Sequence, residues 1–149
     1  MRIAVASDEP YPVHATVKRV LEERGHELVA FGAIASGVAE PWPDVAEAAA
    51  LAVASGACDQ GVFFCWSGTG ISIAANKVAG VRAALCGDPG AAAAARVWNH
   101  ANVLCLSNRT LSDDMAQEIL AAWLDTAPGE RGADGVLRLA AVDARHRAP

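Results

Sequence analysis

The chain has 149 residues and a formal net charge of −5, and its twelve lysines and arginines are scattered along the sequence. This length predicts one domain, 1–149, with a single core, and the unclustered basic residues argue against a nucleic-acid-binding surface. No apolar run reaches the roughly 18 residues of a membrane span, and a strand pattern follows Met1 directly without a signal peptide, so we expect a cytoplasmic protein that contacts no membrane.

Apolar runs alternate with helical patterns along most of the chain. We expect strands at residues 2–7, 27–31, 62–65, 81–86 and 102–106. We expect helices at residues 13–24, 44–55, 71–78, 89–97 and 112–124, with Asp44 as an N-cap and Gly25 as a C′ residue. Strands and helices that alternate at this spacing predict an α/β fold, a Rossmann-like three-layer αβα sandwich with a five-stranded parallel sheet and a C-terminal helical tail.

Some features lie outside this regular pattern. His14 and His26 are predicted to be surface residues at the two ends of the first helix. Trp42 stands between two prolines, which predicts an extended backbone on a surface loop, where the ring either walls a pocket or caps the core. Residues 126–149 contain several glycines and a short helical pattern from Val136 to Val142. Because this tail has little core of its own, we expect it to contact a second subunit.

The stretch VFFCWSGTGISIAANK, residues 62–77, organises the rest of the chain. It passes from a buried-strand pattern through Gly68 and Gly70 into a helix. Several backbone N–H groups of such a loop point into one small space, and the helix N-terminus behind them adds a partial positive charge. That space binds anionic oxygen atoms. Cys65 lies where the strand ends, and a base beside an anion hole can move protons on carbon.

The carboxyl ends of parallel strands lie at one edge of the sheet, where open α/β sheets bind their ligands. This rule gathers the segments that follow four strands: Asp8–Glu9, Cys65–Gly70, Gly87–Asp88 and Asn108–Arg109. An alternative interpretation of the two acids is that they only open a turn before the prolines that follow. We predict a site that topology assembles from segments distant in the sequence.

The four cysteines, at positions 58, 65, 86 and 105, form no Cys-x-x-Cys pair, and no histidine follows at zinc-finger spacing. We therefore expect free thiols and no bound metal. Cys86 and Cys105 end apolar runs without a glycine loop, which indicates small buried side chains. Only Cys65 runs directly into such a loop.

The chemistry of this loop is narrowed by what it lacks. SGTG has neither the GK[ST] of a P-loop nor the third glycine of a dinucleotide site, which disfavours nucleotide binding. A nucleophilic thiol needs a nearby histidine, and His100 is the only candidate that we expect on this rim. A thiol activated by loop amides is a competent base near neutral pH. Aldose–ketose isomerisation needs one base between C1 and C2 and donors for the enediolate oxygens, and Cys65 with the amides of residues 68–72 supplies both.

The run CWSGTGISIAANK, followed by GVRAALC and WNHANVLCLSNR, resembles the ribose-5-phosphate isomerase B family, which also contains the galactose-6-phosphate isomerase subunits. The similarity extends from the first strand to about Trp123. The resemblance implies a Rossmann-like fold and a homodimer, or a dimer of dimers, with active sites shared between subunits. It also implies a sugar or sugar phosphate as substrate, of the kind found in pentose phosphate metabolism, and neither a metal nor an organic cofactor.

The resemblance implies roles for individual positions. The family's catalytic cysteine, the proton acceptor, falls on Cys65, and the hydroxyl thought to assist ring opening falls on Ser67. The anion-hole glycines match Gly68 and Gly70, with Thr69 between them. The other matches are Asp8 for the sugar hydroxyls, Asn99 near the enediolate and Arg109 near the phosphate.

The chain departs from the family at several positions that carry positive charge or protons. Glu9 replaces a histidine after the strand-one aspartate, and Trp98 replaces the ring-opening histidine. Gly132 and Gly135 stand where the family has a tail cluster that reaches the neighbour's phosphate, and Trp66 replaces a glycine. Each charged hydrogen bond to a phosphate contributes on the order of 1.5–3 kcal/mol, so we expect ribose 5-phosphate to be a poor substrate.

We therefore expect an aldose–ketose isomerase for a different sugar phosphate, or for an unphosphorylated or deoxy sugar whose non-reacting end meets Trp66 and Trp98. His100 is a candidate substitute for the missing ring-opening histidine; the alternatives are that its side chain points away or that the open-chain sugar binds directly. Two other classes stay open. One is a non-catalytic sugar-binding module, which the presence of Cys65 disfavours, and the other is nucleophilic thiol chemistry.

Overall fold

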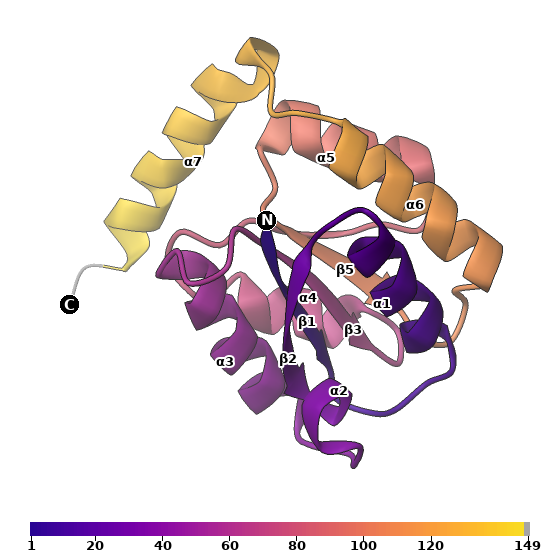
Figure 1. Cartoon of the computed structure of the whole chain (residues 1–149). Helices are drawn as coiled ribbons and strands as arrows, with labels where there is room; N and C mark the ends of the chain where they lie inside the picture. The colour runs from indigo at the N-terminus through magenta and orange to yellow at the C-terminus, as the bar shows by residue number, and fades with distance from the viewer. Residues whose placement is uncertain (148–149) are drawn as a thin grey trace.

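The computed structural model of the chain describes residues 1–147 and contains a five-stranded, entirely parallel sheet between two layers of helices (Figure 1). The strands are β1 (Arg2–Ser7), β2 (Glu27–Gly32), β3 (Gln60–Cys65), β4 (Ala83–Leu85) and β5 (Val103–Ser107). The helices are α1 (Val13–Glu23), α2 (Ala33–Ser36), α3 (Trp42–Ala54), α4 (Thr69–Ala75), α5 (Pro89–Asn99), α6 (Asp113–Asp125) and α7 (Ala133–His146), with a 3-10 turn, η1, at Glu130–Gly132. The predicted α/β sandwich is confirmed. Across residues 1–147, no helix has the length and apolar character that a membrane crossing requires.

The strands lie in the order β2-β1-β3-β5-β4, so β1, β3 and β5 form the centre of the sheet and β4 is an edge strand. The register aligns the carboxyl ends of the central strands, because Ser7 is opposite Phe64 and Cys65 is opposite Ser107. These strands are nearly continuous apolar runs because helices cover both of their faces. The segments that follow β1, β3 and β5 therefore lie together at one edge.

Alternate side chains of the strands pack into two cores, one on each face of the sheet. On one face, Phe64 and its neighbours pack against α1, α5 and α6, and Trp123 of α6 is fully buried there. On the other face, Phe63, Cys65 and Cys105 pack against α3 and α4. The face of α3 toward the sheet consists largely of alanines, which lets this helix lie close to the strands. Cys65 thus points to the side of the sheet that α4 covers.

The prediction for Trp42 was wrong. Trp42 is the first residue of α3 and not part of an extended loop, because the proline after it fits the first helical turn. The helix therefore begins two residues before Asp44, which lies in its first turn and is not the N-cap. The expected loop after β2 also contains the short helix α2, and β4 is only three residues long because the chain before Ala83 does not join the ladder with β5.

His14 is buried, contrary to the prediction that it lies on the surface. Only 6 % of this residue is exposed, and its ring lies 4.7 Å from the ring of Phe64. Its Nε2 lies 2.7 Å from Oδ1 of Asn108, which follows β5. A histidine is tolerated inside a core when its ring nitrogens have hydrogen-bond partners. His14 therefore joins α1 to the central strands.

Helix α7 stands away from the sheet (Figure 1). None of its residues is buried, and Leu137, Leu139 and Val142 are 71 %, 48 % and 42 % exposed. A cleft of ≈ 760 Å³ lies between this helix and the β4–α5 region, with Leu139 and Val142 on one wall and Ala84 and Ala95 on the other. The helix predicted around residues 136–142 is confirmed and is longer than expected.

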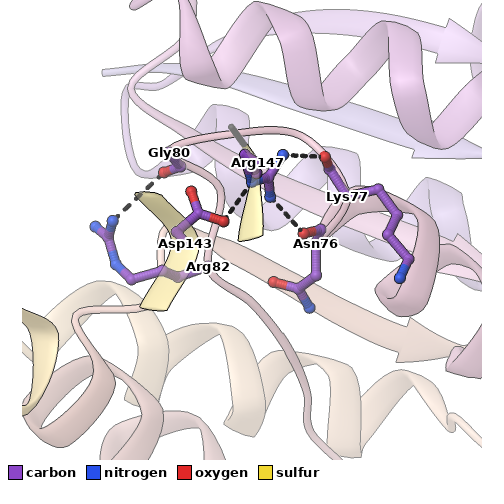
Figure 2. A network of polar contacts seen from close by, with 6 residues as sticks. All are labelled: Asn76, Lys77, Gly80, Arg82, Asp143 and Arg147. Atoms are coloured by element: carbon purple, nitrogen blue, oxygen red, sulfur yellow. Dashed lines mark hydrogen bonds and ion pairs between the residues drawn. The ribbon is translucent and has the colours of Figure 1, made fainter. Parts of the chain in front are cut away.

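The far end of α7 is held by polar contacts at the end of α4 (Figure 2). The Arg147 guanidinium donates to the carbonyl groups of Asn76 and Lys77 and pairs with Asp143, one turn earlier in α7. The Asn76 side chain in turn donates to the Ala83 carbonyl and accepts from the Ala83 N–H, which ties α4 to β4. The tail is thus connected to the helix that carries the glycine loop.

Candidate active site

The sheet has a topological switch point between β1 and β3. The connection that leaves β1 enters α1 on one face, whereas the connection that leaves β3 enters α4 on the other face. Such a switch point opens a crevice outside the carboxyl ends of the two strands. Asp8 directly follows β1 and Cys65 ends β3, so the two residues lie on either side of the switch point at the carboxyl edge that the sequence predicted.

Cys65 is the last residue of β3 and is 5 % exposed, and its side chain belongs to the core that α3 and α4 cover. Its carbonyl accepts two hydrogen bonds, from the N–H of Asn108 at 2.9 Å and from the N–H of Gly68 at 3.2 Å. These bonds fix the strand end and start the loop. All four cysteines are free and buried, and burial raises the pKa of Cys86 to about 11.

Gly68 turns the chain from β3 into α4 with φ = +76°, a left-handed conformation that favours glycine. A Cβ atom there would lie 2.5 Å from Cδ1 of Leu85 and 3.0 Å from the Leu106 carbonyl group, so the loop also packs too tightly for a side chain at this position. Two hydroxyl groups, those of Ser67 and Thr69, lie 2.6 Å apart on its exposed side. The turn presents hydroxyls and amides beside the strand end.

The amides available to an anion are fewer than the sequence indicated. Gly68 donates its N–H to Cys65, and Ser72 donates its N–H to the Gly68 carbonyl. The N–H groups of Thr69, Gly70 and Ile71 are the first three of α4 and have no carbonyl one turn earlier in the helix. The predicted set of amides at 68–72 is therefore narrowed to these three.

Two exposed tryptophans flank the loop. A Cβ atom on Gly70 would lie 3.2 Å from the ring of Trp42, so this ring covers the start of α4; it is 43 % exposed and was not assigned to the site from the sequence. Trp66 is 55 % exposed on the other side, and the Arg109 guanidinium lies 5.0 Å from its ring centre. This spacing is that of a cation–π contact. The loop thus lies between aromatic surfaces.

Arg109 is tied to the loop through its backbone as well, since its N–H donates to the Trp66 carbonyl at 3.0 Å. A pocket of ≈ 370 Å³ opens beside it, with Ser67 and Ser107 among its polar lining residues and Leu85 and Met115 among its apolar ones. The predicted carboxyl-edge residues therefore include one cation that borders a cavity of the size of a small sugar derivative.

Asp8 is 9 % exposed, and its Oδ1 atom has no hydrogen-bond partner among the described residues. Burial, together with the adjacent Glu9 carboxylate, raises the pKa of Asp8 above its usual value. Glu9 itself is exposed and accepts a hydrogen bond from the Tyr11 hydroxyl at 3.2 Å. An unpartnered buried carboxylate oxygen is costly unless a ligand supplies a donor.

Trp98, Asn99 and His100 lie at the opposite edge of the sheet. Helix α5 starts after β4 at the carboxyl edge and ends at Asn99, directly before β5 begins. His100 adopts φ = +46°, accepts a bond from Arg82 on its carbonyl, and places its Nε2 2.8 Å from the Gly129 carbonyl oxygen. The prediction that His100 lies on the same rim as Cys65 was wrong, because an 11-residue helix carries the chain back across the sheet.

Among residues 1–147, no three or more histidine, cysteine or acidic side chains gather closely enough to hold a metal ion.

The model of the ribose/galactose isomerase family matches residues 3–138. This chain belongs to that family. Ribose-5-phosphate isomerase B of Escherichia coli (strain K12) is 40 % identical over 126 residues, which is 84 % of each chain. D-erythrulose-4-phosphate isomerase of Pectobacterium atrosepticum is 35 % identical over 126 residues, 84 % of this chain and 83 % of that one. The solved structure of Clostridium thermocellum ribose-5-phosphate isomerase B matches with a TM-score of 0.91 and 36 % identity over 98 % of this chain and 99 % of its own.

The resemblance inferred from the sequence is confirmed by this membership. As a member of the ribose/galactose isomerase family, the chain is an aldose–ketose isomerase. The relatives differ in the sugars that they act on, and one is a 4-deoxy-4-sulfo-D-erythrose isomerase of a Clostridium species, 29 % identical over 127 residues. The family therefore establishes the class of reaction and leaves the sugar to be inferred from the site.

Proposed function

We propose that this chain interconverts an aldose and a ketose through an enediolate, with Cys65 as the base that moves the proton. The observation that supports this most is the position of Cys65 at the end of β3, beside three free amides of α4 and across the switch point from Asp8. In its ionised form the sulfur takes the proton from C2 of an open-chain aldose, and the amides hold the negative charge that develops on the C1 oxygen. The same sulfur returns the proton to C1, and the hydroxyl proton on O2 moves to O1, which yields the ketose.

Asp8 and Ser67 complete the half of the site that one chain carries. The unpartnered Oδ1 of Asp8 accepts a hydroxyl of the sugar, which supplies the donor that this buried atom lacks. The Ser67 hydroxyl, bonded to Thr69, assists opening of the sugar ring. Gly68 keeps the turn in its left-handed form, and Thr69 and Gly70 present their amides to the enediolate.

We propose that a second copy of the chain completes the site with Trp98 and Asn99. Within one chain these residues lie at the edge of the sheet opposite Cys65, so they cannot reach the reacting carbons. The exposed leucine and valine side chains of α7 and the cleft beside β4 offer an apolar surface for such a copy. A dimer, or a dimer of dimers, would then contain sites built from two subunits.

Mixing two inactive variants tests this arrangement. Cys65→Ser and Asn99→Ala chains are each expected to be inactive, but a refolded equal mixture is expected to recover roughly a quarter of the wild-type turnover per chain. Half of the randomly formed dimers are hybrids, and one of the two sites in each hybrid is intact. If Cys65 and Asn99 act within one chain, the mixture stays as inactive as its components, and the shared site is rejected.

We further propose that the preferred sugar is not ribose 5-phosphate. Glu9 places a carboxylate beside Asp8, and Arg109 already lies against the Trp66 ring. Gly132 packs so closely on the end of α5 that a Cβ atom would lie 2.5 Å from the Val97 carbonyl oxygen, so this part of the tail has no room for a side chain. The exposed Trp66 ring instead favours the apolar face of a sugar that lacks a phosphate or carries a different substituent.

A panel of aldoses and ketoses with four to six carbons, each with and without phosphate, tests the substrate. Turnover is followed by NMR in D2O, and the best substrate is expected to exceed ribose 5-phosphate by at least about a hundredfold in kcat/KM. Deuterium is expected at C1 or C2 of that sugar, because Cys65 exchanges its proton with solvent. Turnover of ribose 5-phosphate equal to the best sugar would reject the substrate proposal, and binding without deuterium incorporation would favour a sugar-binding module.

A further inference from the structure

A bridge of three buried side chains, His14, Asn108 and Ser7, connects α1 to the ends of the three central strands. His14 Nε2 lies 2.7 Å from Asn108 Oδ1, and Asn108 Nδ2 donates to Ser7 Oγ at 3.2 Å. Ser7 Oγ donates onward to the Glu9 carbonyl at 2.7 Å. The three residues are 6 %, 6 % and 0 % exposed. The bridge therefore ends at the Asp8–Glu9 turn, on the substrate side of β1.

The same asparagine also holds the end of β3. Its backbone N–H donates to the Cys65 carbonyl at 2.9 Å, and this carbonyl also receives the N–H of Gly68. The His14 ring packs on Phe64, the residue before Cys65, at 4.7 Å. Ser7 and Phe64 are opposite each other in the sheet and face α1, whereas Cys65 faces α4. The bridge thus supports Cys65 from the opposite face of the sheet.

Every hydrogen-bonding group of the His14 ring is used, which fixes the tautomer. Its Nδ1 accepts the N–H of Tyr11 at 3.3 Å, so Nε2 carries the hydrogen that is donated to Asn108. This orientation makes Asn108 Oδ1 the acceptor and leaves its amide hydrogens for Ser7. A ring with both nitrogens occupied does not carry protons for a substrate.

We propose that His14 and Asn108 are positioning residues that hold Cys65 and the Asp8–Glu9 turn at a fixed separation across the switch point. The inference rests on the proposed function only in treating Cys65 as the reacting group. Neither residue touches the substrate. A displacement at the strand ends on the order of 1 Å costs a proton-transfer site roughly a hundredfold in rate, so such support is itself a determinant of activity.

The bridge requires neutral His14. Burial lowers the pKa of His14 below its usual value of 6.5. Between the folded pKa and the unfolded pKa of His14, the unfolded chain therefore binds more protons than the folded chain. The contribution of His14 to stability is present above about pH 6.5 and is lost as pH falls toward the folded pKa. Protonation also makes Nδ1 a donor that faces the Tyr11 N–H donor. Tyr11 lies next to the ring, with the two ring centroids 6.1 Å apart, and its hydroxyl donates to Glu9. Phe64 of β3 packs on the ring at 4.7 Å. Asp8 precedes Glu9 in the chain, and Arg109 follows Asn108.

The test compares His14→Gln, His14→Leu and Asn108→Ala with the wild-type chain, and uses His26→Gln as a control because that histidine lies near the amino terminus of β1. Glutamine can donate to Asn108 and accept from Tyr11, and it does not titrate. Amide hydrogen exchange is measured residue by residue by NMR, and the alkylation rate of Cys65 by iodoacetamide is measured by peptide mass spectrometry. The reporting amides are those of Asn108, Gly68 and Glu40, which bond to the carbonyls of Cys65 and Asp8; the reference amides are those of Gly61 and Asp59 at the other edge.

In His14→Leu and Asn108→Ala, protection of the three reporting amides is expected to fall about tenfold or more while the reference amides do not change. The Cys65 alkylation rate is expected to change with them, and both readings are expected to stay near wild type in His14→Gln and His26→Gln. Between about pH 7 and about pH 5, wild type but not His14→Gln is expected to lose this protection after correction for intrinsic exchange.

The proposal would be overturned if amide protection fell equally at both edges of the sheet or did not fall at all. It would also be overturned if protection fell without a change in Cys65 alkylation, or if wild type and His14→Gln showed the same pH trend. If His14→Leu does not fold, the comparison of wild type with His14→Gln across pH still decides whether His14 is a positioning residue. Retained turnover in a Cys65 variant would reject the proposed function alone, because the amide measurements do not depend on it.

Discussion

Replacing Cys65 by serine is expected to lower isomerase turnover by about 10²–10⁴-fold, because the loss removes the base that transfers the proton. A serine hydroxyl has nearly the shape of the thiol but is far less ionised near neutral pH, so it fits the end of β3 without serving as the base. The measurement is turnover of the best sugar from the panel, together with deuterium incorporation from D2O. Both are expected to fall together, since both depend on the same proton transfer.

Cys58→Ala is the matched control for this variant. Cys58 is also buried and free, but it precedes β3 and lies at the amino edge of the sheet, where its N–H bonds to the Ala52 carbonyl. Its removal is expected to lower thermal stability slightly and leave the turnover of folded protein unchanged. Turnover within tenfold of wild type in Cys65→Ser, with circular dichroism unchanged, contradicts the role of Cys65 as the base.

The strands and the glycine loop could be predicted because their signals are local. Apolar runs of strand length and the glycines at 68 and 70 fix where β3 ends, and they place Cys65 at that end without any knowledge of the rest of the fold. The carboxyl-edge rule then brings Asp8 and Arg109 to the same side. Local signals and one topological rule were enough to bring Cys65, Asp8 and Arg109 to one edge of the sheet.

The residues that the sequence misplaced depend on partners far along the chain. His14 looks like a surface residue at a helix start, and only its contact with Asn108, 94 residues later, explains its burial. Trp42 is flanked by prolines that suit either an extended segment or a helix start. Its ring contacts Gly70 only when α3 and α4 pack together. Periodicity does not encode such pairings.

The misplacement of His100 has a different cause, since the sequence contained a usable signal. The helix expected at 89–97 starts after a strand, and a helix that starts at the carboxyl edge must end at the amino edge. Trp98, Asn99 and His100 follow that helix and therefore lie opposite Cys65. This same geometry supports the proposal that a second subunit supplies them.

Glu9→His is expected to shift the substrate preference toward phosphorylated sugars. The change removes a negative charge beside Asp8 and adds a donor, and one charged hydrogen bond of about 1.5–3 kcal/mol corresponds to roughly a 10- to 100-fold gain in kcat/KM for ribose 5-phosphate. The same variant is expected to lose activity toward ribose without phosphate, or to leave it unchanged, because the gain requires an anionic group. The measurement is the ratio of kcat/KM for ribose 5-phosphate and ribose in wild type and variant.

Glu118→His separates this local effect from a general change in net charge. Glu118 is exposed on α6, so its substitution changes the charge of the chain by the same amount away from the Asp8–Glu9 turn. The ratio is expected to stay at its wild-type value in this control, and the difference between the two variants is expected to shrink at high salt, since exposed charges are screened beyond about 10 Å at 0.1 M. An equal rise in both variants contradicts selection by Glu9 and assigns the effect to overall charge. A rise confined to Glu9→His shows that a single carboxylate at the end of β1 turns this member of the family away from phosphate.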